Sequence, residues 1–346
     1  MKKCMLYIGL ALSTIACNKK DNEKTEVIQQ KQELTYDVFE TARVVNDVSQ
    51  VPFIVYPKSD RIHLYSQPNE KTDFIDQPIT KLETLFGESE VSNFYKIIYQ
   101  VDQNPQNSKY AYVLKSDVDK DNELLLTVDD ELDRLRYINI NGNTNDEIKS
   151  LNKIGSIELI DKSVYNTVFK KNQYPLLTNS NKPALENNLY SFRLRTGELK
   201  EIPNQSNEEG FYELNYLGFS KDFDRHFFQA TLDQAPLNIN SFSTINKELP
   251  EVHFQGFPVY LKSKQLVASI ANDEAGVLLT IDQYNPENYT FTEQYAINLV
   301  NFNVANSKSL IWDNEGSLYL EIHHPNTNIS TKNYKKQYVK IQLNNL

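Results

Sequence analysis

The sequence predicts a mainly β protein, with a small antiparallel barrel followed by a larger domain of repeated β hairpins. Three observations point to this fold. Tyr (21) and Phe (17) are plentiful among 346 residues, and aromatic side chains suit half-buried strands. Short stretches of alternating apolar and polar residues are separated by polar turns. Turn-like segments recur at similar distances in the second half of the chain.

Residues 1–16 have the layout of a secretory signal peptide. Two lysines precede a short apolar run, whereas a membrane-spanning helix would need roughly 20 apolar residues. The stretch STIAC, which ends at Cys17, resembles the lipobox of bacterial lipoproteins. The resemblance implies cleavage before Cys17 and attachment of a diacylglycerol to its sulfur, although Thr14 stands where leucine is usual. The alternative is an ordinary cleaved signal with an incidental cysteine.

Residues 17–50 are expected to be a tether. They begin with a polar stretch that has too few apolar residues to build a core. The other cysteine, Cys4, lies in the signal, so the mature chain is expected to hold one cysteine and no disulfide. The resemblance therefore implies a protein of the bacterial cell envelope. It would be held through lipidated Cys17 on the periplasmic or the surface face of the outer membrane.

The overall charge limits the partners. Acidic residues outnumber basic ones by 46 to 36, which gives a net charge of −10. A surface that binds nucleic acid needs clustered Lys and Arg, so this charge argues against a nucleic-acid partner. Anionic lipid would also repel the chain weakly, so membrane attachment must come from acyl chains.

Residues 51–120 are expected to form the small barrel. A strand through RIHLY is followed by the turn SQPN, and a second strand is expected over 79–86, ending at Gly87. Two further strands are expected at 94–99 and 110–114, where alternation is clear. Short antiparallel strands at this spacing are typical of a small barrel.

Three stretches of this region, LYSQPNE, FYKIIY and YAYVLKSDV, resemble the bacterial SH3-like family. Tyrosine stands where the family typically has tryptophan in the second stretch, and Ala-Tyr replaces a Gly-Trp pair in the third. The resemblance implies a barrel that binds cell-wall peptides or acts as an interaction module. The candidate binding residues are aromatic side chains that can form a groove, namely Tyr65, Phe94, Tyr95, Tyr110 and Tyr112. The alternative is that these rings fill the barrel core.

An acidic segment joins the two modules. Asp117, Asp119 and Asp121 alternate as the first ligands of a calcium loop do. Asn122, however, replaces the turn glycine of such a loop, and Val128 replaces its bidentate glutamate. These residues therefore predict an acidic linker rather than a metal site.

Residues 121–346 are expected to form a larger, propeller-like β domain. The stretch YSFRLRTGELKEIP predicts a hairpin about a turn at 195–198. Later units have turns near residues 222, 263 and 314, at intervals of about 41 and 51 residues. Such intervals favour propeller blades or a stacked-sheet array, and an irregular β-sandwich is the alternative. Helices are expected to be few, over 123–136 and 145–152.

No catalytic motif stands out in the sequence. It contains no Gly-x-Ser-x-Gly elbow, no His-Glu-x-x-His motif and no glycine-rich phosphate loop. Glu321 and His323 share one face of an expected strand, yet two ligands do not complete a metal site. Asp222 and Asp224 are expected to be solvated acids in a turn. Neither a metal nor an organic cofactor is expected.

The sequence therefore favours a non-catalytic binding or interaction module on the cell envelope, with peptidoglycan or an envelope protein as partner. One alternative is a carbohydrate-active hydrolase that uses acids of the C-terminal domain. Another is an accessory subunit of an outer-membrane assembly. Carboxylates that converge in one pocket would favour the hydrolase, and a large exposed apolar patch would favour the assembly.

Overall fold

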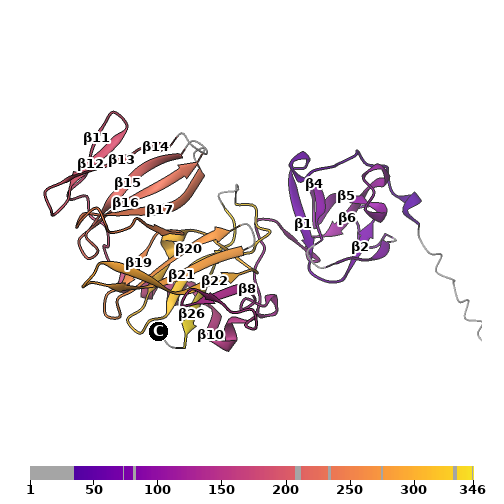
Figure 1. Ribbon diagram of the computed structural model, residues 1–346. Coiled ribbons are helices and arrows are strands. Elements are labelled where there is room, and N and C mark those ends of the chain that lie inside the picture. The colour runs from indigo at the N-terminus through magenta and orange to yellow at the C-terminus, as the bar shows by residue number, and fades with distance from the viewer. Residues whose placement is uncertain are drawn as a thin grey trace, which may run out of the picture.

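The computed structural model describes residues 35–72, 74–80, 83–206, 212–232, 235–273, 276–329, 333–344 and 346. The expected signal peptide, Cys17 and the first half of the expected tether lie outside these residues. The described chain is mainly β, as the sequence predicts, and contains one α-helix. Its strands form two groups, which run from indigo to purple and from magenta to yellow in Figure 1. No helix in the described part is long and apolar enough to cross a membrane.

The first group is a seven-stranded antiparallel sheet that curls into a half-barrel (Figure 1), with the strand order β3-β2-β6-β5-β4-β1-β7. Alternate residues of each strand face inward, so Ile62 and Leu64 share a buried core with Ile97 of the neighbouring strands. The strands are β1 (Phe53–Pro57), β2 (Arg61–Tyr65), β3 (Phe74–Pro78), β4 (Leu85–Val91), β5 (Phe94–Gln100), β6 (Ser108–Leu114) and β7 (Val118–Lys120).

The strands expected at 94–99 and 110–114 are confirmed as β5 and β6. The strand expected over 79–86 is wrong in its bounds, because β4 begins at Leu85 and continues through Gly87 to Val91. A Cβ added to Gly87 would lie 2.2 Å from the ring of Phe53, so this glycine permits close packing rather than a turn. The resemblance of the sheet to the SH3-like family stays a prediction.

The described second half of the expected tether lies on this sheet. Phe39 joins the barrel core, and Thr41 forms a β-bridge with Lys109 of β6. Val45 is fully buried, and its carbonyl accepts a hydrogen bond of 2.6 Å from the side chain of Gln100. Residues 35–50 therefore pack with the barrel.

The acidic segment that joins the two modules includes β7, which pairs with β1 of the barrel. Asp121 follows this strand and is 4% exposed. Its backbone nitrogen donates to the Ile54 carbonyl at 3.0 Å, and its carboxylate accepts a bond of 3.3 Å from Asn328. The backbone nitrogen of Lys335 donates to the carbonyl of Asn122 at 2.9 Å. The join is therefore hydrogen-bonded to both modules.

The larger domain consists of four layered antiparallel sheets (Figure 1). The first sheet is β11-β12-β13, the second is β14-β15-β16-β17-β18, the third is β19-β20-β21-β22-β8-β9, and the fourth is β10-β26-β25-β23 with β24 beside β25. The one α-helix of the described residues, α1 (Lys162–Asn172), packs on the outer face of the fourth sheet.

The strands of these sheets are β8 (Leu135–Ile140), β9 (Asn143–Thr144), β10 (Gly155–Ile160), β11 (Ala184–Glu186), β12 (Leu189–Arg193), β13 (Leu199–Pro203), β14 (Gln205–Ser206), β15 (Tyr212–Ser220), β16 (Arg225–Leu232), β17 (Ala235–Ser243), β18 (Val252–Phe254), β19 (Val259–Leu261), β20 (Leu266–Asp273), β21 (Gly276–Asn285), β22 (Thr290–Leu299), β23 (Asn303–Val304), β24 (Ile311–Trp312), β25 (Leu318–His323) and β26 (Gln337–Leu343).

Side-chain alternation builds a separate core in each gap between the layers. In β16, Phe227 faces the third sheet and Phe228 faces the first, because consecutive strand residues point to opposite faces. In β20, Val267 likewise faces the second sheet and Ala268 faces the fourth. The inner sheets are therefore apolar on both faces, which explains the runs of consecutive buried residues in these strands.

The hairpins expected in this domain are confirmed. β12 and β13 flank the turn at 195–198. The turns near residues 222, 263 and 314 join β15 to β16, β19 to β20 and β24 to β25. The layers correspond to the stacked array that the spacing favours, while closure into a propeller stays a prediction.

The helices expected over 123–136 and 145–152 are wrong. Each region holds only one 3-10 turn, at Val128–Asp130 and at Leu151–Lys153. The first region then enters β8, whose Leu135 and Ile138 complete the core of the third sheet. Tertiary packing therefore overrides the local helical pattern here.

Candidate functional site

The five aromatic residues singled out in the barrel do not share one face. Tyr95 points into the barrel core. Tyr65, Phe94, Tyr110 and Tyr112 alternate with core residues and so lie on the outer face of the sheet. Tyr65 lies opposite Tyr112, and its ring meets that of Phe94 edge-on at 5.3 Å between centroids. Tyr65 and Phe94 are buried, whereas Tyr110 and Tyr112 are half-buried, and a binding groove here stays a prediction.

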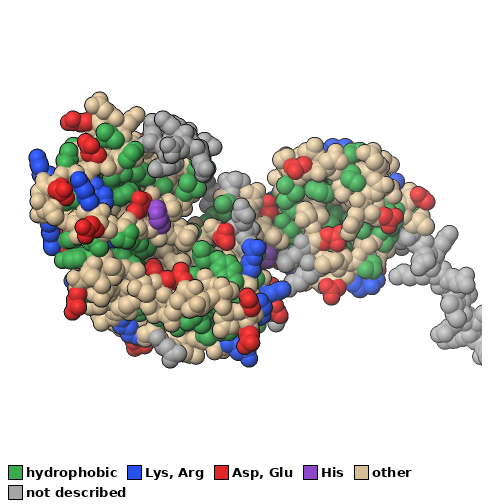
Figure 2. Space-filling view, viewed as in Figure 1, with side chains coloured by type: hydrophobic (Ala, Val, Ile, Leu, Met, Phe, Trp, Pro, Cys, Tyr) green, Lys and Arg blue, Asp and Glu red, His purple; other side chains and the backbone are tan. Residues whose placement is uncertain are grey.

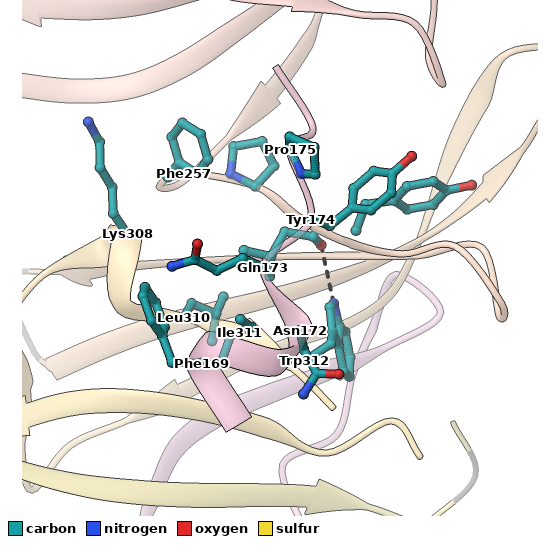
Figure 3. Close-up of a pocket in the computed structure, with 13 residues that line it drawn as sticks. Phe169, Asn172, Gln173, Tyr174, Pro175, Phe257, Lys308, Leu310, Ile311 and Trp312 are labelled. Atoms are coloured by element: carbon teal, nitrogen blue, oxygen red, sulfur yellow. Dashed lines mark hydrogen bonds between the residues drawn. The ribbon is translucent and has the colours of Figure 1, made fainter. Parts of the chain in front are cut away.

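A cavity of about 470 Å³ lies in the larger domain beside the end of α1 (Figure 3). Three segments meet there: the end of α1 with the chain that follows it, the approach to β19, and β24 with the turn η7 (Ser307–Ser309). The lining is mostly aromatic and aliphatic, with two amides and one ammonium: Phe169, Asn172, Gln173, Tyr174, Pro175, Phe257, Pro258, Val259, Tyr260, Lys308, Leu310, Ile311 and Trp312. We call it the Trp312 cavity.

Two aromatic–proline pairs shape this cavity. Pro175 follows Tyr174 and Pro258 follows Phe257, and a residue before proline is held extended. Gly256 brings the second pair close to β20, because a Cβ at this position would lie 1.9 Å from the carbonyl oxygen of Ile270. The cavity therefore depends on local backbone restrictions as well as on the layered cores.

Trp312 forms the inner wall of the cavity. Its Nε1 donates a hydrogen bond of 3.2 Å to the carbonyl oxygen of Val259, drawn as a dashed line in Figure 3. The side chain is almost completely buried, and it is the single tryptophan of the sequence. Since β24 and β19 belong to different sheets, this bond joins the third and fourth layers at the cavity.

Tyr174 forms part of the outer wall and is held by Asp222. The Tyr174 hydroxyl donates to Asp222 Oδ2 at 2.6 Å, and Lys262 Nζ lies 2.8 Å from Oδ1. The hydrogen bond to Asp222, together with burial, raises the pKa of Tyr174, so the phenol remains a donor at neutral pH. The expectation of solvated acids is wrong for this turn. Asp222 is ion-paired with Lys262, and Asp224 is ion-paired with Arg195 at 2.7 Å.

Polar groups lie at one end of the cavity. Figure 3 shows the Gln173 amide directed to the same end as Lys308, with Phe257 and Leu310 on either side. The ammonium of Lys308 lies 5.7 Å from the centroid of the Phe257 ring. The amide can donate and accept hydrogen bonds, and the ammonium can donate. The cavity therefore combines apolar walls with a small number of polar groups, as ligand sites commonly do.

Titratable residues elsewhere form no metal-binding cluster in the described part of the chain. His323 and His324 are buried, and His323 Nδ1 lies 2.9 Å from the carbonyl oxygen of His324. Burial and the neighbouring Glu293 raise the pKa of Asp282 to about 6. Neither Asp282 nor Glu293 lines the Trp312 cavity.

Reasoning from the sequence missed this cavity. Two signals were present, namely the single tryptophan and the two aromatic–proline pairs outside the expected strands. Neither signal indicates that residues about 140 positions apart meet, because that follows from the order of the layers.

No family model matches the chain, and comparison with curated proteins and with solved structures gives no match either. The chemistry of the site is therefore the basis for its function.

Proposed function

We propose that this protein is a lipid-anchored envelope protein that binds a ligand without transforming it, through the Trp312 cavity. The lining of the cavity carries the proposal, because five aromatic rings and two prolines surround it with only a few polar groups. Such walls hold a ligand by contact and by hydrogen bonds that fix its orientation. The lipobox-like stretch at Cys17 supports the anchoring part of the proposal.

The cavity suits a ligand with an uncharged ring or aliphatic face and hydrogen-bonding substituents. Tyr174 and Phe257 can pack against such a face. The amides of Asn172 and Gln173 can pair with hydroxyl or amide groups, and Lys308 can donate to a carbonyl or carboxylate. Cell-wall glycopeptides carry all of these groups. A peptidoglycan fragment is therefore the proposed ligand class.

The barrel is proposed to supply a second contact with the wall. Tyr110 and Tyr112 are half-buried on its outer face, and Lys96 Nζ lies 3.8 Å from the centroid of the Tyr110 ring. Two weak contacts on one chain would act together on an extended polymer. A Tyr110→Ala/Tyr112→Ala variant is expected to sediment less with intact sacculi, and unchanged sedimentation would remove the barrel from the proposal.

Trp312 provides the assay for the cavity. The chain has one tryptophan, so its fluorescence emission reports on this cavity alone. Titration of muramidase-digested peptidoglycan into the full chain in detergent is expected to shift the emission to saturation. Phe257→Ala removes one wall and is expected to weaken binding by at least about tenfold. Tyr137→Ala removes a half-buried ring that does not line the cavity and is the matched control. Equal affinity of Phe257→Ala and the unmodified chain would refute the assignment.

Anchoring has a separate test. Cys17→Ala is expected to move the protein from the membrane fraction to the soluble fraction, because the acyl chains would be lost. Cys4→Ala, which removes the other cysteine, is the control and is expected to leave the protein on the membrane. Membrane retention of Cys17→Ala would refute lipid anchoring and would leave the cavity assignment intact.

A further inference from the structure

The outer wall of the Trp312 cavity includes one aromatic ring that borders the solvent. Tyr174 lies at the side of the cavity away from Lys308 in Figure 3. It is 43% exposed, whereas Tyr260, the other tyrosine of the lining, is buried. The two rings meet edge-on, with 6.1 Å between their centroids. The Tyr174 ring therefore separates part of the cavity from the solvent.

The backbone around Tyr174 is fixed on both sides. α1 ends at Asn172, two residues earlier, and packs on the fourth sheet. The nitrogen of Leu176 donates to the Tyr174 carbonyl at 2.8 Å, and the Leu176 side chain is buried in the core between the second and third sheets. Thr178 then forms two backbone hydrogen bonds with Phe219 of β15, at 2.9 Å and 2.8 Å. Movement at Tyr174 is therefore rotation of its side chain about a fixed backbone.

Asp222 holds this side chain from outside the cavity. The Tyr174 hydroxyl donates to Asp222 Oδ2 at 2.6 Å. Asp222 does not line the cavity, so it acts on the cavity through Tyr174. A hydrogen bond to an ionised carboxylate is shorter and stronger than one between neutral groups. The position of the Tyr174 ring is therefore set by a charge-assisted bond that a ligand in the cavity does not contact.

Asp222 is itself held by the core beneath it. Its carbonyl oxygen accepts a hydrogen bond of 3.1 Å from the Tyr284 hydroxyl, and Phe223, the next residue, is completely buried. Lys262 Nζ lies 2.8 Å from Asp222 Oδ1, which leaves Oδ2 to the Tyr174 hydroxyl. The carboxylate therefore has supports that do not depend on Tyr174.

The two bonds to this carboxylate differ in exposure. Figure 2 shows acidic and basic side chains mixed along the left edge of the larger body, on the side that carries the labels β16 and β19 in Figure 1. The Lys262 side chain is 65% exposed, whereas that of Asp222 is 19% exposed. An ion pair with one exposed partner contributes little. The bond from Tyr174 is therefore the stronger part of this contact, and Lys262 supports it.

We propose that the Tyr174 side chain is a gate of the Trp312 cavity, which Asp222 and Lys262 hold closed. Rotation of Tyr174 away from Asp222 opens the outer wall, and the bond re-forms to close the wall behind a bound ligand. Asp222 is thus a positioning residue, which controls how fast a ligand enters and leaves. This role rests on the proposed assignment of the cavity as the ligand site, but opening of the wall can be measured without a ligand.

Acrylamide quenching of Trp312 emission in the full chain in detergent tests the gate. Trp312 is the single tryptophan and forms the inner wall, so quenching measures access through the cavity. Tyr174→Phe keeps the ring and removes the hydroxyl. Loss of a hydrogen bond to a charged acceptor shifts the balance of closed and open positions by about tenfold, so the quenching constant is expected to rise at least about twofold. Tyr137→Phe removes a hydroxyl outside the cavity and is the matched control. Equal constants for Tyr174→Phe and the unmodified chain would overturn the proposal.

A double-mutant cycle tests whether Asp222 acts through Tyr174. Asp222→Ala removes the acceptor and is expected to raise the quenching constant as Tyr174→Phe does. Asp222→Asn keeps an oxygen acceptor and is expected to restore part of the protection, and Lys262→Gln is expected to have a smaller effect than either. Because the two residues share one bond, Asp222→Ala in the Tyr174→Phe background is expected to add little. Additive effects, in variants that circular dichroism shows to be folded, would overturn the role of Asp222.

Ligand exchange separates the gate from the proposed function. Muramidase-digested peptidoglycan is expected to dissociate faster from Tyr174→Phe than from the unmodified chain after dilution of the complex, because the wall no longer closes behind it. Equal dissociation rates would overturn the gate and leave the ligand class intact. If the unmodified chain binds no peptidoglycan, the ligand class is refuted, and a raised quenching constant in Tyr174→Phe would still support the gate.

Discussion

Replacing Phe223 by alanine tests whether the layered cores hold the larger domain together. Phe223 lies in the turn between β15 and β16 and is completely buried. Its ring centroid lies 4.7 Å from that of Tyr284, 4.8 Å from that of Tyr260 and 5.1 Å from that of Phe291. These three rings belong to β21, β19 and β22, so one side chain joins the second sheet to three strands of the third.

We expect Phe223→Ala to lower the free energy of unfolding of the larger domain by about 4 kcal/mol. Truncation of a buried phenylalanine to alanine costs about 3–5 kcal/mol, and the loss of three aromatic contacts places this position above the low end of that range. For a domain of more than two hundred residues this corresponds to a fall in Tm of about 8–16 °C.

The assay is urea unfolding followed by the emission of Trp312. Because Trp312 is the single tryptophan and lies in the larger domain, its emission reports on that domain without a contribution from the barrel. Leu237→Ala is the control, since this side chain is 51% exposed and its loss should change stability by no more than about 0.5 kcal/mol. A loss below about 1 kcal/mol for Phe223→Ala would refute the reasoning, because the layers would then be held by other contacts.

Three further outcomes are expected. The pKa of Asp282 is raised to about 6 from an unfolded value of about 4, so its contribution to stability is full below about pH 4 and is lost as the pH rises through about 6. Asp282→Asn should therefore have a higher Tm than the unmodified chain at pH 7 but not at pH 4, and a constant difference would contradict this. Hydrogen bonds from Lys115 and Lys120, at 2.7 Å and 2.6 Å, lower the pKa of Glu90 to about 2, so its contribution is present above about pH 4.5 and is lost as the pH falls towards 2. Glu90→Gln should flatten this acid dependence in circular dichroism melts and should cost less than about 1 kcal/mol at pH 7, because the carboxylate is exposed. Gly256→Ala forces the backbone away from the carbonyl of Ile270, so it should lower the Tm and shift the Trp312 emission, and an unchanged emission would mean that the cavity does not depend on this contact.

Strand positions could be predicted where alternation and turn chemistry agree. The hairpin at 195–198 is an example, since Gly197 adopts the left-handed φ of 88° that its turn requires. The same holds for the turn near residue 314, where Gly316 has a φ of 100°. In both cases the information lies within a few residues of the turn.

Features set by distant contacts could not be predicted in this way. Gly87 looks like a turn residue, but its role is fixed by the ring of Phe53 on a neighbouring strand. Asp222 looks like a solvated acid, yet Tyr174 and Lys262 reach it from distant segments. The Trp312 cavity has the same origin, because it forms only where parts of three separate segments meet.

The pairing of β10 with β26 has a consequence for how the chain acquires its structure. Gly155 lies opposite Leu343, so the fourth sheet joins residues separated by roughly 190 positions. A growing chain cannot form this pairing until β26 has been synthesised, and contacts of such long range make folding slow. A truncated chain that ends before residue 337 would lack β26, the strand between β10 and β25. The core between the third and fourth sheets would then be exposed. Such a product would expose apolar surface and be open to proteolysis, so folding of this domain requires β26.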